Sequence, residues 1–243
     1  MIKRLLILVA IALFGLMILP LVTQLTPFTQ LTPLATRYVE GGSSELGAAN
    51  LVTAVVVTYR GLDTLGEVTV LFAATAGVGF LLRRRAGKEE EAAAHANSAN
   101  DETAAGSSMP SPFSEILSTG SVVLFPLVLM FGAYIFVHGH LTPGGGFQGG
   151  VVIASGFAML LAANAGRKLN HGVLLVVESL SGAFYVAMGL LGLVLAAGFL
   201  DTTFLPLGTL GQVFSAGAIP IIYSLVGLKV GSELTNILES LRK

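Results

Sequence analysis

Ionisable side chains interrupt or border the long apolar runs of this sequence, and these are the residues that could do chemistry. Asp63 and Glu67 lie in YRGLDTLGE at the start of one run, and Glu178 interrupts another in VLLVVESLSG. Lys229 follows a third run, and we expect it at a depth that lets it pair with Glu178. Because burying a charge in hydrocarbon is expensive, such a residue predicts either an ion pair or a group that binds a cation or relays a proton.

A second candidate is the stretch HGHLTPGGGFQGG, which separates two apolar runs. His138 and His140 either cap the preceding helix, where the helix dipole favours them, or accept a proton near neutral pH. Proline ends a helix, and glycine permits positive φ and close backbone approach, so a tight hairpin is expected. The other residues of this hairpin motif are Pro143, Gly144, Gly145, Gly146 and Gln148. Neither a haem nor a metal site nor another cofactor is expected.

The elements that carry these residues are predicted to be membrane helices. Hydrophobic residues make up 53% of the 243 residues and charged ones 11%. Crossing about 30 Å of hydrocarbon takes about 20 helical residues, and backbone groups in lipid must be satisfied within the helix. The absence of cysteine excludes thiolate clusters and thiol catalysis, and a net charge of -1 gives no indication of nucleic-acid binding. The sequence predicts an all-α polytopic membrane protein that is not itself an enzyme.

About six transmembrane helices are expected, two plus four. They cover residues 5–22, 64–82, 116–137, 147–165, 173–200 and 207–228. The first is interpreted as a spanning helix rather than a signal peptide, and the shorter apolar segment 46–60 as an interfacial or re-entrant helix. With both termini cytoplasmic in the plasma membrane, every lysine and arginine except Arg37 and Arg60 falls inside, in accordance with the positive-inside rule.

Composition divides the chain into three parts. Residues 1–86 form a two-helix unit and residues 114–243 a four-helix unit. Between them, residues 87–113 are rich in alanine, serine and acidic residues, which predicts a flexible cytoplasmic linker.

Small residues recur at every fourth position in the helix after the hairpin. They are Gly150, Ala154, Ala158 and Ala162. Such a ridge lets another helix approach closely, either within this bundle or from a neighbouring protein of a complex.

Two segments resemble parts of a known transport family. FGAYIFVHGHLTPGGGFQGGVVIASG resembles the B subunit (MnhB/MrpB) of Mrp-type multisubunit Na+/H+ antiporters, over about residues 114–243. AANLVTAVVVTYRGLDTLGEVTVLFAATAGV resembles the C-terminal end of the antiporter's large A subunit; in membrane-bound hydrogenases this unit is a separate small subunit. The matching positions are Asn50, Arg60, Gly61, Asp63, Thr64, Gly66 and Glu67.

The resemblance implies an accessory subunit of a cation/proton antiporter module, in an Mrp antiporter or a related hydrogenase or sulfur-reducing respiratory complex. It would help to form the sodium-translocating part. Its partners would be large A/D-type and small C-, E-, F- and G-type membrane subunits, membrane lipid and, in a respiratory complex, hydrogenase-like peripheral subunits. The candidates for the ion path are Asp63, Glu67, Glu178, His138, His140 and Lys229. The alternatives are a purely structural membrane scaffold and a self-sufficient transporter, the latter disfavoured because the two units show no internal repeat.

Overall fold

The fold is all helical, as predicted. The computed structural model describes residues 2–23, 31–96, 112–163 and 168–242, and within these ranges every regular element is a helix. Five of the described helices are long and apolar enough to cross a membrane. The chain divides into two compact units, Met1–Arg37 and Tyr38–Lys243, which we consider separately.

The first unit consists mainly of α1 (Ile2–Thr23). Its apolar stretch Arg4–Pro20 is shorter than the five spans and occupies the range predicted for the first membrane helix. Aliphatic side chains are exposed on all sides of it, including Leu8 at 64% and Met17 at 78%. A helix that is apolar all round needs lipid or protein around it.

The second unit opens with short helices that lead into a long one. After α2 (Pro33–Ser44), Asn50 caps α3 (Leu51–Ala54), which continues as a single π-helical turn, η1 (Val55–Tyr59). These two elements are the short helix expected over 46–60. α4 (Gly61–Ala96) follows; its apolar part ends at Leu82, and the helix extends into the range expected to be linker. Residues 97–111 of that range lie outside the described residues.

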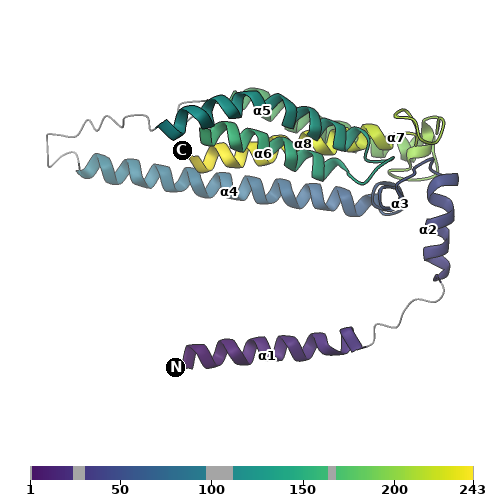
Figure 1. The fold of residues 1–243 in the computed structure, drawn as a ribbon, viewed down its shortest axis with the longest axis horizontal. Helices are drawn as coiled ribbons and strands as arrows, with labels where there is room; N and C mark the ends of the chain where they lie inside the picture. The colour runs from purple at the N-terminus through teal and green to yellow at the C-terminus, as the bar shows by residue number, and fades with distance from the viewer. Residues whose placement is uncertain (1, 24–30, 97–111, 164–167, 243) are drawn as a thin grey trace. The chain divides into compact units, whose positions relative to one another are not determined.

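Helix α8 is the centre of the second unit. The remaining helices are α5 (Pro112–Val137), α6 (Gly146–Ala163), α7 (His171–Leu195), the 3-10 turn η2 (Thr202–Phe204) and α8 (Ile219–Arg242). α8 packs against α4, α5, α6 and α7, which run alongside it (Figure 1). In α8, 56% of the membrane-span window is buried within the chain, against 6% in α4. The outer helices therefore present apolar faces to their surroundings.

The predicted boundaries of the last two spans were wrong. α7 ends at Leu195 rather than near 200, and residues 207–218, expected in the last helix, are a loop. Glycine explains this, because Gly208, Gly211 and Gly217 adopt positive φ, which a helix does not contain. The last span, Ile219–Leu241, therefore starts twelve residues later than expected. Lys229 consequently lies near its middle, about 15 Å from its start at 1.5 Å per residue.

The ridge of small residues on α6 is partly an internal contact. A Cβ on Gly150 would lie 2.8 Å from the carbonyl oxygen of Gly227 in α8. Ala154 is buried, Ala158 is half-buried and Ala162 is exposed. The first half of the ridge thus lets α6 approach α8, while its far end faces outward.

Replacing Gly150 by valine should destabilise the bundle by about 1–3 kcal/mol, because the added carbons overlap the backbone of α8. The midpoint of heat denaturation in detergent measures the effect. Gly120→Val is the matched control, since a Cβ there meets nothing within 4 Å. Equal midpoints for the two variants would show that α6 does not pack as closely as described.

Candidate functional site

The hairpin between α5 and α6 is held by the short helices of the N-terminal part. The amide nitrogen of the Asn50 side chain donates to the carbonyl oxygens of Gly139 (2.8 Å) and Thr142 (3.0 Å). The Thr53 hydroxyl donates to the same Gly139 oxygen at 2.6 Å, and the backbone N–H of Asn50 donates to the His140 oxygen at 3.0 Å. The two segments that carry the sequence motifs are therefore bonded directly to each other.

The hairpin glycines serve close approach, not unusual backbone angles. None of Gly144, Gly145 and Gly146 has positive φ, so that part of the expectation was wrong. A Cβ on Gly139 would lie 2.7 Å from the ring of Tyr223, and one on Gly146 would lie 2.8 Å from the Tyr223 carbonyl oxygen. The hairpin lies against the start of α8, where the Tyr223 hydroxyl donates to Thr53 at 3.1 Å.

The two histidines of the hairpin have different surroundings. His138 is partly exposed, stacks on Tyr134 at 4.3 Å between ring centroids, and lies near the end of α5 as a capping residue would. His140 is fully buried, with Nε2 3.2 Å from the carbonyl oxygen of Gln212. A carbonyl only accepts, so Nε2 carries the hydrogen; Nδ1 is buried without a hydrogen-bond partner among the described residues.

Burial lowers the pKa of His140 from its ordinary 6.5, and the neighbouring His138 lowers it further. The hydrogen bonds with the backbone of Gln212 and Val137 act in the opposite direction without cancelling the effect of burial. His140 is therefore a neutral acceptor at physiological pH, not a charged helix cap.

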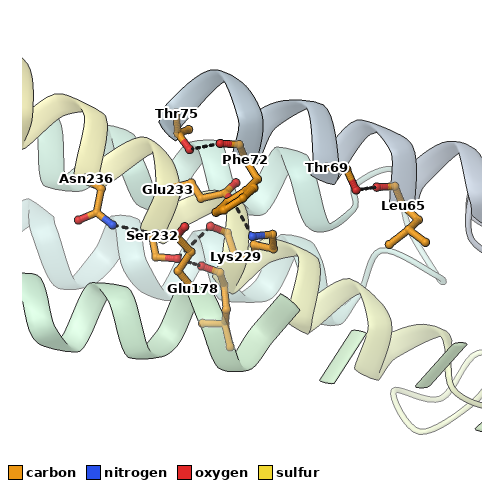
Figure 2. A network of polar contacts seen from close by, with 10 residues as sticks. Leu65, Thr69, Phe72, Thr75, Glu178, Lys229, Ser232, Glu233 and Asn236 are labelled. Atoms are coloured by element: carbon orange, nitrogen blue, oxygen red, sulfur yellow. Dashed lines mark hydrogen bonds and ion pairs between the residues drawn. The ribbon is translucent and has the colours of Figure 1, made fainter. Parts of the chain in front are cut away.

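A buried ion pair lies at the middle of the last span. Lys229 Nζ is 2.6 Å from Glu233 Oε1, and the two side chains are 10% and 0% exposed. The predicted pairing of Lys229 with Glu178 is wrong, because α8 is shifted along the sequence. Nζ also lies 5.0 Å from the centroid of the Phe72 ring on α4 (Figure 2).

Further polar pairs continue from the ion pair toward the end of α8. Asn236 donates to Glu178 Oε2 of α7 at 3.0 Å, and His171 Nε2 at the start of α7 lies 3.3 Å from Glu239 Oε1. The spacings of four, three and three residues place the α8 members on one helix face. We call this set the polar stripe: Lys229, Glu233, Asn236 and Glu239 of α8 with His171 and Glu178 of α7.

Sequence reasoning misses three members of the polar stripe. Glu233, Asn236 and Glu239 fall in a tail beyond the last predicted span, because the preceding apolar run has the hydropathy of a helix that crosses the membrane. Two signals could have found them. The segment 206–217 contains a proline and glycines that break helices, and residues 229–239 show polar side chains at helical spacing.

The two carboxylates of α4 are not part of the polar stripe in this structure. Asp63 pairs with Arg60 at 2.5 Å, but both side chains are more than half exposed, so the pair contributes little to stability. Glu67 is exposed on α4. In the part of the chain that the structure describes, no group of three histidine, aspartate or glutamate side chains could hold a metal ion.

Two family models match adjacent parts of the chain. Residues 116–236 match the domain related to the MnhB subunit of Na+/H+ antiporter, and residues 3–98 match the MbhE subunit of MBH. A relative from Rhizobium meliloti, named as a probable K+/H+ antiporter protein of the A/B type, is 32% identical over 60% of this chain. The chain spans only 15% of that relative's length.

Solved membrane complexes contain similar chains. One chain of the membrane-bound sulfane sulfur reductase, an archaeal respiratory membrane complex, is 40% identical, with a TM-score of 0.79; the match covers 99% of this chain and 98% of that one. In the Mrp complex from a Dietzia species the identity is 26% and the TM-score 0.72, over 98% of this chain and 26% of that one.

The fold and these likenesses define a multi-pass membrane subunit of a cation/proton antiporter-type module. The chain belongs to the family of proteins with a domain related to MnhB of Na+/H+ antiporters, here preceded by an MbhE-type unit. The resemblance deduced from the sequence is thereby confirmed.

Asn50→Ala should lower the free energy of unfolding by about 3 kcal/mol, because it removes a helix cap and two hydrogen bonds to the hairpin. Asn170→Ala is the matched control. Asn170 caps α7 through the same kind of contacts, to the N–H groups of Gly172 and Val173, so its loss should cost only about 1 kcal/mol. Heat denaturation in detergent compares the two, and equal losses would mean that the hairpin bonds add nothing.

Stability should fall as the pH drops below about 6.5, because the unfolded chain then protonates His140 while the folded chain keeps it neutral. A single group of this kind contributes up to about 1.4 kcal/mol per pH unit. Midpoints of heat denaturation between pH 7.5 and 5.0 measure the slope, which His140→Gln should reduce. His138→Gln should leave the slope unchanged; the reverse pattern would contradict the assignment.

Proposed function

We propose that this chain is an accessory, non-catalytic subunit that helps to form the sodium-translocating part of a cation/proton antiporter module in a membrane-bound respiratory complex. The end-to-end likeness to the sulfane sulfur reductase chain supports the respiratory setting. The Mrp chain extends far beyond the matched part, so a free-standing fusion of the two units suits the respiratory type better.

The observation that carries the proposal is the Lys229–Glu233 pair in the middle of the last span. Removing two charges from water costs several kcal/mol for each ion, and hydrophobic residues would pack there at no such cost. Ionisable residues at this depth mark ion or proton pathways. The pair also lies where α8 meets Phe72 of α4, so both family units contribute to its surroundings.

The surface of the second unit supports a place among other membrane proteins of a complex. Large apolar side chains are exposed on the outer helices, such as Val70 and Phe80 of α4 and Ile116 of α5. We assign these faces to lipid and to A/D-type and small C-, E-, F- and G-type subunits, with hydrogenase-like subunits at the membrane surface. The placement of the termini in the cytoplasm rests on the positive-inside rule, with Lys229 now counted in the membrane.

Asp63, Glu67, Glu178, His138 and His140 remain candidates for the ion path. Of these, Glu178 is the one that the structure joins to the polar stripe, through Asn236. Asp63 and Glu67, on α4, would serve a step in which a neighbouring protein of the complex covers their exposed side chains.

Lys229→Met and Glu233→Gln should each reduce sodium-dependent proton transport at least tenfold, because each leaves the other group of the pair without its partner. Either single change should also destabilise the chain by about 3–5 kcal/mol. Transport is measured as the sodium-induced pH change in membrane vesicles that contain the whole complex, and assembly by native electrophoresis.

The double variant separates transport from folding. Lys229→Met with Glu233→Gln removes both charges, so it should assemble better than the single variants and still fail to transport. Lys168→Met and Glu115→Gln are controls at exposed positions. Normal transport by the double variant would reject the ion-path role and leave a structural scaffold as the function.

A further inference from the structure

The polar stripe reaches from one end of α8 only to its middle. Lys229 and Glu239 are ten residues apart on the same face, which is about 15 Å of helix, half of an apolar layer about 30 Å thick. The opposite half of α8 is different. Val226, Ile222 and Ile219 are buried and apolar, and Gly227 is packed against the ring of Phe136.

Three successive members of the polar stripe hold an oxygen atom whose hydrogen-bonding capacity is unmet. They are Glu233 Oε2, Asn236 Oδ1 and Glu239 Oε2, all buried and without a hydrogen-bond partner in the part of the chain that the structure describes. Leaving a buried acceptor unsatisfied costs about 1–3 kcal/mol. Three such atoms along one helix face therefore point to donors that the chain does not supply, namely protons or water.

We propose that the polar stripe is a proton half-path, open to water on the side of the membrane where α8 ends and closed at Lys229. This proposal rests on the antiporter-module function and assigns to it the ion and the side. The half-path begins at His171, whose side chain is 40% exposed, and Glu239, which is 3% exposed. An imidazole at the mouth suits a proton, since histidine exchanges one near neutral pH.

The composition of the polar stripe favours a proton over a sodium ion. Each of its pairs joins a carboxyl oxygen to a nitrogen donor: His171 with Glu239, Asn236 with Glu178, and Lys229 with Glu233. A hard cation takes several oxygen ligands and no nitrogen–hydrogen donors. The ammonium group at the closed end would also repel it.

The transfer step is the protonation of Glu233. A proton that enters at Glu239 passes through water to Glu233 Oε2 and forms an O–H bond there, which makes that carboxyl neutral. Lys229 then loses its counter-charge, while Glu178 on α7 is the next carboxyl facing this part of α8. The O–H bond breaks again when the proton leaves, so no other reactant is needed.

Cysteine labelling of the assembled complex tests the half-path without requiring transport. The chain has no cysteine of its own. Ser232→Cys lies beside the polar stripe and Val226→Cys lies beyond Lys229; the native side chains are 5% and 1% exposed, so burial alone predicts similar protection. A small membrane-impermeant thiol reagent is applied from each side of the vesicles, and the mass of this chain is followed.

We expect Ser232→Cys to react at least tenfold faster than Val226→Cys, and only from the side where α8 ends. Equal rates, or reaction from the opposite side, would overturn the half-path. In the same vesicles, Glu239→Gln should slow sodium-dependent proton exchange at least fivefold, while Glu115→Gln should not. Wild-type rates for Glu239→Gln would also overturn it, whereas a wild-type complex without sodium–proton exchange would reject the antiporter function and leave the labelling result standing.

Discussion

A charged side chain at the middle of a membrane helix requires a partner, and the second unit is arranged around the one that Lys229 has. Glu233 lies one turn further along α8, so the pair forms within a single helix and does not depend on a distant contact. The neighbouring helices then shield it. Gly182 of α7 leaves room for the lysine stem, and Phe72 of α4 places a ring near the ammonium group. The central position of α8 follows, because a helix that carries such a pair has to be surrounded by protein.

The contact between the two family units explains how these helices keep their places. Asn50 and Thr53 hold the carbonyl groups of the α5–α6 hairpin, and the Tyr223 hydroxyl joins Thr53 to the start of α8. At the same end of the bundle, Thr58 of η1 lies 3.0 Å from Thr202 of the loop between α7 and α8. These hydrogen bonds tie the start of the α4 segment to α5, α6 and α8. Joining the units in one chain is therefore consistent with a site to which both contribute.

The two ends of α8 differ in a way that bears on transport. Toward its start the helix is buried among apolar side chains and glycines in close contact, and His140 is held neutral nearby. Toward its end, ionisable and amide groups follow one another along one face (Figure 2). A single chain of this design provides access from one side, and the rest of the crossing falls to its neighbours. This fits one component of a larger module better than a transporter that acts alone.

The sequence by itself determined the membrane class, the helical fold, the hairpin and the family. Long apolar runs, the HGHLTPGGGFQGG motif and the segment around Asn50 are local signals that do not depend on packing. It could not determine where the last helix begins, because an apolar run broken by glycines has the hydropathy of a span but not its backbone angles. That one boundary decided the depth of Lys229 and hid Glu233, Asn236 and Glu239. Only the tertiary structure brings α7 against α8 and pairs Glu178 with Asn236, since contacts between residues far apart in the chain depend on how helices face each other.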